Sequence, residues 1–252
     1  MSLLYHKRVY NVYMDKYRDF FNAYVAGYDT ESEWIWRKHE HTIRVADNCR
    51  VLADDLKFNA YNTDLAELIG LFHDIGRFEQ WRVYQSFSDD KTIDHADLGV
   101  KIIKENGILA EHPDYELILK AIYNHNKFKI DAKITDDREL TFCKLIRDAD
   151  KLDIIREFVS GDLKLPQDGE TYSIKALNEI AKHKLLNRKA HVDTADVSLT
   201  ALALFNDIYF DYTKRCIQEE FLIEKIVELY IKSDPAQTNL FRQLERFIKE
   251  QY

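Results

Sequence analysis

Residues that favour turns are scarce in this sequence, which has seven glycines and three prolines among 252 residues. An average protein contains about 7% Gly and 5% Pro, so both residue types are under-represented. A chain with so few turn residues does not readily form many short strands. We therefore expect a mostly helical protein.

Cysteine is also rare. Cys49, Cys143 and Cys216 are far apart and form no CxxC pair, which argues against a disulfide framework and against a cysteine-based zinc site. No apolar run reaches the roughly 18 residues of a membrane-spanning helix. The first twenty residues are too polar for a secretory signal. These absences favour a cytoplasmic location and no membrane partner.

Positive charge is in deficit, with 36 basic against 44 acidic residues and a net charge of −8. This balance disfavours a broad nucleic-acid-binding surface. Hydrophobic residues make up 46% of the chain and aromatic residues 13%, enough apolar surface for a folded core. We expect a globular protein without a nucleic-acid partner, and the sequence does not indicate an oligomeric state.

Helical periodicity is present along most of the chain, where apolar residues recur at three- and four-residue spacing. It predicts helices over residues 5–26, 32–57, 63–75, 95–105, 114–126, 138–157, 173–186, 194–211, 213–232 and 235–250. Two of these helices have recognisable starts: Asp94 with Asp97 resembles a capping box, and Asp234 precedes Pro235.

Two segments, residues 76–94 and 160–173, interrupt the periodicity and predict long connections. The second contains two of the seven glycines and one of the three prolines. We expect a helical core over residues 1–160 and a C-terminal helical extension over residues 161–252 that packs on it. A single domain is the alternative.

Several chemically active side chains fall on the apolar faces of predicted helices. They are four histidines and two aspartates: His41, His73, Asp74, His95, His125 and Asp150. Burying a carboxylate without a partner costs several kcal/mol, whereas histidine nitrogen and aspartate oxygen are ligands of divalent metals. Each histidine alone is more often a hydrogen-bonded core residue, but the set together favours a metal site.

The sequence around these residues resembles a known family. His41 in HEHTIRVA, His73–Asp74 in LFHDIGRF and Asp150 in RDADKLD resemble the H…HD…D signature of the HD-domain superfamily. The resemblance covers about residues 35–157. It implies an all-α helical bundle with the fold of a metal-dependent phosphohydrolase.

The resemblance extends to His95 in DHADLGV and His125 in AIYNHNK, which are similar to the two further histidines of dinuclear HD proteins. It implies one metal held by His41, His73, Asp74 and Asp150. A second metal would then be held by Asp74, His95 and His125, with Asp74 bridging.

The number and kind of metal ions stay open. Asn126 stands where many dinuclear members have a second histidine, so we expect one or two divalent transition-metal ions. The resemblance allows Mn, Fe, Ni, Zn or Co, with Mg as a further option. Asp148 is the rival of Asp150 as a ligand, although Asp150 aligns better with the family motif.

Charged residues close to these motifs are candidates for the reaction. Besides Asp74, we expect Arg77 and Lys151 to contact the phosphate, and Glu79, five residues beyond Asp74, to orient water as a general base. Each of the three residues could instead belong to an ordinary ion pair, such as one between Arg77 and Glu79.

An aromatic group lies in the same 76–94 segment and consists of Trp81, Tyr84 and Phe87. Such rings could stack on a nucleobase. Anchoring a long connection onto the core is the favoured alternative.

The expected function is therefore a metal-dependent phosphohydrolase. It would act on a small phosphorylated substrate, with a nucleotide as the leading class, by attack of a metal-bound hydroxide on phosphorus. The alternatives are a di-iron oxygenase of the HD-domain type and a metal-binding regulatory module without catalysis. No P-loop, GxGxxG, GxSxG or HExxH motif is present, so those mechanisms have no support.

Overall fold

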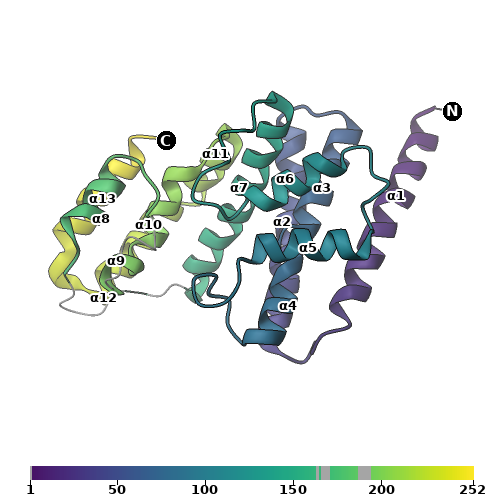
Figure 1. Cartoon of the computed structure of the whole chain (residues 1–252). Helices are drawn as coiled ribbons and strands as arrows, with labels where there is room; N and C mark the ends of the chain where they lie inside the picture. Colours follow the sequence, from purple (N-terminus) through teal and green to yellow (C-terminus); the bar gives the residue numbers. More distant parts are fainter. Residues whose placement is uncertain (1, 163–164, 166–170, 187–193) are drawn as a thin grey trace. The chain divides into compact units, whose positions relative to one another are not determined.

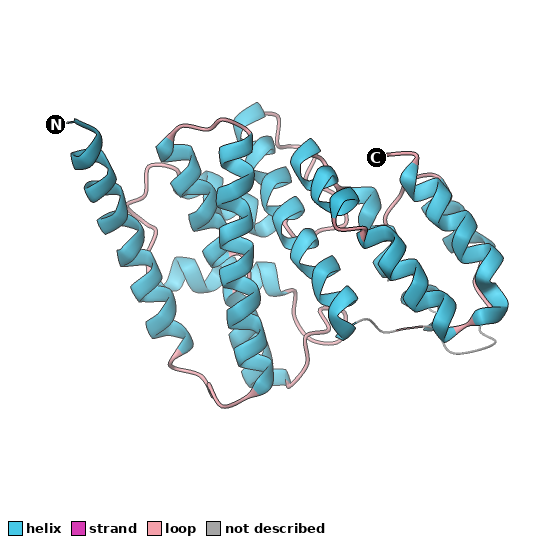
Figure 2. Ribbon diagram, turned by 180° about the vertical axis from the view of Figure 1, so that it is seen from behind, coloured by secondary structure: helices cyan, strands magenta, loops and turns pink. Residues whose placement is uncertain are grey.

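The computed structural model describes residues 2–162, 165, 171–186 and 194–252, with side chains from Met14 onward. All regular structure in these residues is helical (Figures 1 and 2), which confirms the predicted all-α class. Part of the connection predicted over residues 160–173 lies outside the described residues. None of the helices described is both long and apolar enough to cross a membrane.

The chain divides into two compact units, Met1–Asp150 and Lys151–Tyr252. The two-part organisation with a boundary at residue 160 stays a prediction. The first unit contains α1 (Ser2–Val25), α2 (Glu33–Asp55), α3 (Ala60–Phe72), α4 (Ile75–Tyr84), α5 (His95–Asn106), α6 (Tyr115–Asn124) and most of α7 (Asp137–Glu157). Within it, α2 packs along α3, and α4 packs along α5.

Helix α4 corrects the prediction that residues 76–94 form a connection throughout. Its residues Ile75 and Phe78 are fully buried, and their spacing of three matches a helix. Gly76 weakened the helical signal, but glycine is required there. A Cβ on Gly76 would lie 2.2 Å from the carbonyl oxygen of His95, so its absence lets α4 approach the start of α5.

A second glycine brings α2 and α3 together. A Cβ on Gly70 would lie 2.7 Å from the Cα of Ala46 and 2.9 Å from the Sγ of Cys49. The backbones of α2 and α3 can therefore approach closely here. This approach places His41 on α2 next to His73 at the C-terminal end of α3.

The predicted helix starts differ in outcome. The side chain of Asp94 accepts hydrogen bonds from the backbone N–H groups of Ala96 (3.0 Å) and Asp97 (3.1 Å), so Asp94 caps α5 as predicted. Asp234 precedes Pro235, but its side chain makes no capping hydrogen bond. Pro235 opens a short 3-10 turn (Pro235–Gln237), and α13 begins only at Thr238.

The second unit contains the end of α7, a π-helical turn (Phe158–Asp162) and several shorter helices. These are α8 (Ile174–Ala181), α9 (Thr194–Ser198), α10 (Thr200–Leu204), α11 (Asp211–Glu219), α12 (Leu222–Ser233) and α13 (Thr238–Lys249), with a 3-10 turn at Phe205–Asp207.

Two long helices predicted in this unit are each divided. The hydroxyl of Ser198 donates to the Ala195 carbonyl (2.6 Å) and that of Thr200 to the Val197 carbonyl (2.7 Å). Such side-chain bonds compete with backbone helix bonds, and the chain bends between α9 and α10. The second division lies at Phe221, whose φ of 53° is left-handed and interrupts a right-handed helix.

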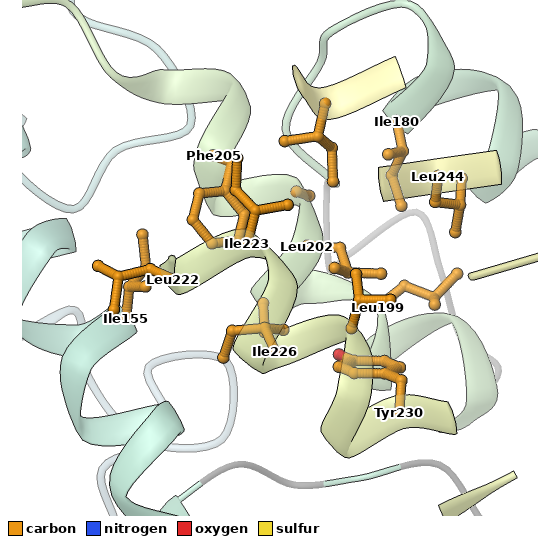
Figure 3. Close-up of a cluster of buried hydrophobic side chains, with 14 of the residues drawn as sticks. Ile155, Ile180, Leu199, Leu202, Phe205, Leu222, Ile223, Ile226, Tyr230 and Leu244 are labelled. Carbon is orange, nitrogen blue, oxygen red and sulfur yellow. The ribbon is translucent and has the colours of Figure 1, made fainter. Parts of the chain in front are cut away.

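The core of the second unit is a dense cluster of aliphatic and aromatic side chains (Figure 3). It includes Ile155, Leu199, Leu202, Phe205, Leu222, Ile226 and Tyr230. The Tyr230 hydroxyl donates to the backbone carbonyl of Ser198, so this polar group is satisfied inside the core.

Candidate metal centre

Six residues from separate elements of the first unit meet at one buried place. They are His41 on α2, His73 at the end of α3, Asp74 before α4, His95 at the start of α5, His125 at the end of α6 and Asp150 on α7. None is more than 9% exposed. The structure thus brings together all six residues that the sequence assigned as metal ligands.

Asp74 lies between two pairs of histidines. Its Oδ2 is 3.6 Å from His41 Nε2 and 3.8 Å from His73 Nε2. Its Oδ1 is 3.3 Å from His95 Nε2 and 3.6 Å from His125 Nε2. One carboxylate oxygen therefore faces each pair, which is the arrangement that a bridging ligand requires.

Asp150 completes the half of the cluster around His41 and His73. Its Oδ1 lies 3.1 Å from His41 Nε2 and 3.7 Å from His73 Nε2. Among the described residues, Asp150 belongs to a group with suitable ligand spacing, together with His73 and His125, whereas its rival Asp148 belongs to none. Figure 1 shows α2 and α7, which carry His41 and Asp150.

Three of the four histidines are oriented through their Nδ1 atoms. The acceptors are Gly70 O for His73 (2.7 Å), Ile122 O for His125 (2.6 Å) and Asp89 Oδ2 for His95 (2.7 Å). Carbonyl and carboxylate oxygens only accept hydrogen bonds, so each Nδ1 must carry the proton and donate. In the neutral ring, Nε2 then has a free lone pair that points into the cluster, as in metal-binding histidines.

These lone pairs fit a cation. The Nε2 atoms of His95 and His125 are 2.9 Å apart, so two acceptors face each other when both rings are neutral. The Nε2 of His73 is buried and makes no hydrogen bond. A divalent ion would satisfy these nitrogens and the carboxylates together. The residues present therefore fit a metal centre.

The carboxyl groups are held in the ionised form that metal ligands need. Burial by itself raises the pKa of Asp74, but Lys38 and the surrounding histidines outweigh it and hold this pKa well below its ordinary value. Burial also raises the pKa of Asp150, but the neighbouring imidazoles of His41 and His73 outweigh it and hold this pKa well below its ordinary value.

The histidines of the second half are held neutral. Burial, with a further contribution from the Arg77 charge, lowers the pKa of His95 to about 4. Burial also lowers the pKa of His125. Both rings are therefore deprotonated at neutral pH, which leaves their Nε2 lone pairs ready to bind a metal.

Lys38 is a residue of this centre that the sequence reasoning missed. Its Nζ lies 3.0 Å from Asp74 Oδ2, and its side chain is 21% exposed. Lys38 precedes His41 by three residues on α2, so both project from the same face of the helix. That spacing was the available signal.

Asp89 was also missed, because it lies in an irregular part of the 76–94 segment. Besides accepting from His95, it accepts from Arg77 Nη1 (2.9 Å) and Gln80 Nε2 (3.0 Å). Asn126 donates to it at 3.3 Å. Asp89 thus fixes the ring of His95 and connects it to neighbouring polar side chains.

Of the predicted catalytic residues, Arg77 lies beside the centre. Its Nε is 3.6 Å from Asp74 Oδ1. Its Nη1 donates to Gln80 Oε1 (2.7 Å), the Phe87 carbonyl (2.8 Å) and Asp89 Oδ1. Arg77 does not pair with Glu79, so it combines a charge near Asp74 with an anchor for the segment after α4.

Glu79 and Lys151 have other partners. Glu79 accepts from Arg82 at 2.5 and 2.7 Å and from the Tyr28 hydroxyl at 3.3 Å. Lys151 forms an ion pair with Asp207 at 2.8 Å within the second unit. Among the described residues, Glu79 belongs to no group of side chains that could hold a metal, and the catalytic roles of Glu79 and Lys151 stay predictions.

Comparison with known proteins agrees with this geometry. Residues 39–155 match the family model of the HD domain. This segment is an HD domain. The matched segment contains all six residues of the cluster. HD domains bind divalent metals and are generally hydrolases, so the match supports a metal-binding protein of the metal-dependent phosphohydrolase family. Searches of curated proteins and of solved structures found no match.

Proposed function

We propose that this HD-domain protein is a metal-dependent phosphohydrolase that acts on a small phosphate ester. The observation that carries the proposal is the position of Asp74, with one oxygen toward each pair of histidines. That arrangement suits two adjacent cations, and paired cations stabilise both the attacking and the leaving oxygen of a phosphoryl transfer.

The side chains of the centre would hold the cations, and their own hydrogen bonds keep the ligand atoms in fixed orientations. Asp74 and Asp150 supply negative charge, and the histidines supply neutral nitrogens that are fixed through their Nδ1 atoms. A bound divalent cation lowers the pKa of a coordinated water and polarises the phosphoryl oxygens. Burial of the ligands strengthens electrostatic interactions at this place.

Positive side chains next to Asp74 match the charge of a phosphate ester. Lys38 and Arg77 approach its carboxylate from different elements. Negative charge on the equatorial oxygens must be stabilised during phosphoryl transfer, and we propose that these two residues contribute to it. We include Arg77 as a phosphate contact, as its sequence position suggested.

The test begins with protein purified without chelator and loaded separately with Mn, Fe, Co, Ni or Zn. Phosphate release is then measured over a panel of nucleotides and sugar phosphates. We expect release with at least one metal, and its loss in Asp74→Asn. His112→Asn changes a buried histidine outside the centre and should keep the activity.

Other outcomes would overturn the proposal. Oxygen consumption that depends on iron, without phosphate release, would assign the centre to the oxygenase alternative. Metal binding without turnover of any compound in the panel would favour the regulatory module.

A further inference from the structure

An exposed aromatic cluster lies beside the metal centre in the first unit. Trp34, at the start of α2, packs against Trp81 of α4 with ring centroids 5.3 Å apart and the ring planes tilted by 37°. Phe87 packs against both, at 5.0 Å from Trp81 and 6.3 Å from Trp34. Trp34 is nevertheless 43% exposed. Anchoring the segment after α4 explains the packing of Trp81 and Phe87, but it does not require a tryptophan exposed to this extent.

Two cations connect this cluster to the centre. Lys38 Nζ lies 5.6 Å from the centroid of the Phe87 ring and 3.0 Å from Asp74 Oδ2. The guanidinium of Arg77 lies 5.8 Å from the same ring and also faces Asp74. Successive contacts therefore link the Asp74 carboxylate, through two positive charges, to the aromatic rings.

Helix α2 arranges these parts in order. Trp34, Lys38 and His41 are spaced by four and three residues, so they share one face of the helix. At a rise of about 1.5 Å per residue, Lys38 lies about 4.5 Å and Trp34 about 10.5 Å along the axis from His41. A metal ligand, a cation and an exposed ring thus follow each other along one line.

Lys38 has donors to spare. An ammonium group has three N–H donors, and the Asp74 carboxylate takes one of them. By contrast, Nη1 of Arg77 is already shared among three acceptors. At the outer end, Arg37 lies 5.5 Å over the Trp34 ring and pairs with Glu33 at 3.9 Å. The cluster is therefore complementary to a ligand that is both anionic and aromatic.

We propose that Trp34 and Lys38 form the substrate-recognition surface, with Lys38 binding the phosphoryl oxygens and Trp34 stacking on a nucleobase. The proposal rests on the phosphohydrolase function and names its substrate class: a nucleotide, in which a sugar joins the phosphate to a planar ring. Stacking on a tryptophan is tolerant of base identity, because every base has a π-face.

A matched pair of substrates distinguishes the contact of Lys38 with the phosphate from the contact of Trp34 with the base. Adenosine 5′-monophosphate and ribose 5-phosphate share the phosphate and the sugar, and only the first has a base. The kcat/KM of the metal-loaded protein is measured for both. Trp34→Leu should lower the value for adenosine 5′-monophosphate by about tenfold or more and leave that for ribose 5-phosphate unchanged.

Two further variants complete the design. Trp36→Leu removes a tryptophan that is 58% exposed and lies off the Trp34–Lys38–His41 face, so both values should stay as in the wild type. Lys38→Met should lower both values by a similar factor, because both substrates carry the phosphate. Elemental analysis must show unchanged metal content in Lys38→Met, since a loss of metal would overturn the assignment of Lys38 to the phosphate.

Equal effects of Trp34→Leu on the two substrates, or equal effects of Trp34→Leu and Trp36→Leu on the nucleotide, would overturn the recognition surface while leaving the phosphohydrolase function intact. If the protein hydrolyses neither substrate, the phosphohydrolase proposal fails, and the recognition surface can still be tested by measuring binding. Calorimetric titration of the metal-loaded protein gives the affinity for each substrate. Tighter binding of adenosine 5′-monophosphate than of ribose 5-phosphate, lost only in Trp34→Leu, would support the surface even without turnover. Absence of both turnover and selective binding would overturn both proposals.

Discussion

The two units of the molecule both bury ionisable groups, but they satisfy them in different ways. In the second unit, Asp207 pairs with Lys151, and Asp196 accepts from the backbone N–H and the hydroxyl of Ser173 at 2.8 and 2.5 Å. In the first unit, Asp74 and Asp150 are surrounded by histidine nitrogens.

The two units differ in whether the chain itself supplies partners for these buried groups. The chain itself supplies the partners of Asp207 and Asp196. In the first unit, inward lone pairs of His73, His95 and His125 face carboxylates or one another, and only an added cation satisfies all of them. Buried polar groups that the chain leaves unsatisfied are thus a better marker of function than buried polar groups as such.

Asp234 shows that one unsatisfied buried carboxylate is not enough to mark a site. It is fully buried in the second unit, and its two carboxylate oxygens accept no hydrogen bond. It belongs to no group of metal-type ligands among the described residues. A lone unsatisfied carboxylate therefore does not indicate a site, and the convergence of several ligand types is what distinguishes the first unit.

Loss of a ligand should produce the largest effect. We expect His41→Ala and Asp150→Ala to abolish metal retention, because the two side chains hold the same half of the centre. The helices should persist, since their cores are built from other residues. Elemental analysis and circular dichroism measure the two properties. Full metal occupancy in both variants would rule out the assignment.

Breaking the Lys151–Asp207 pair should affect stability instead. Both side chains are at most 10% exposed, and removal of one partner from a buried pair costs about 3–5 kcal/mol. Lys151→Met should therefore lower the free energy of unfolding in denaturant titrations and leave metal content unchanged. A variant of normal stability with a raised KM would instead restore Lys151 as a phosphate contact.

Disturbing the orientation of His95 should have an effect of intermediate size on metal affinity. Asp89→Asn weakens the acceptor for His95 Nδ1, and loss of such a supporting contact typically reduces metal affinity about 10–100-fold. We expect this loss for one of two bound ions in a metal titration. Asp90→Asn alters the neighbouring exposed residue and should bind both ions normally; if the two variants behave alike, Asp89 does not position His95.

Glu79 should have the smallest effect. It pairs with Arg82 at the surface, and exposed pairs contribute about 0–1 kcal/mol. Glu79→Gln should therefore change kcat/KM less than about threefold once a substrate is known. A loss of a hundredfold or more would support the predicted general-base role.

The sequence predicted much of the first unit because its signals are local. Helical periodicity located α2, α5 and α7, and the motifs around the four histidines and two aspartates named the residues that the structure brings together. Gly76 concealed α4, since its role depends on a close approach to His95 that no local pattern encodes. Asp89 and Lys38 were missed because they act through ligands that are distant in sequence or on the next helical turn.

The second unit was less predictable. Its helices are short, and the breaks at Leu199 and Phe221 involve residues that ordinarily continue a helix. A left-handed φ at a phenylalanine runs against the local preference of this residue type, so no local pattern predicts it. The Lys151–Asp207 pair joins residues far apart in sequence, so no local pattern identified Asp207 as the partner of Lys151.

Metal stoichiometry tests most directly whether the six-residue cluster of the first unit binds divalent cations. Protein purified without chelator and then saturated with a transition metal should contain two ions per chain. His125→Ala should reduce the number to one, because the His125 Nε2 lies beside the Oδ1 of Asp74 together with His95. A stoichiometry of one in both proteins would restrict the centre to the half around His41, and the absence of bound metal would contradict the account.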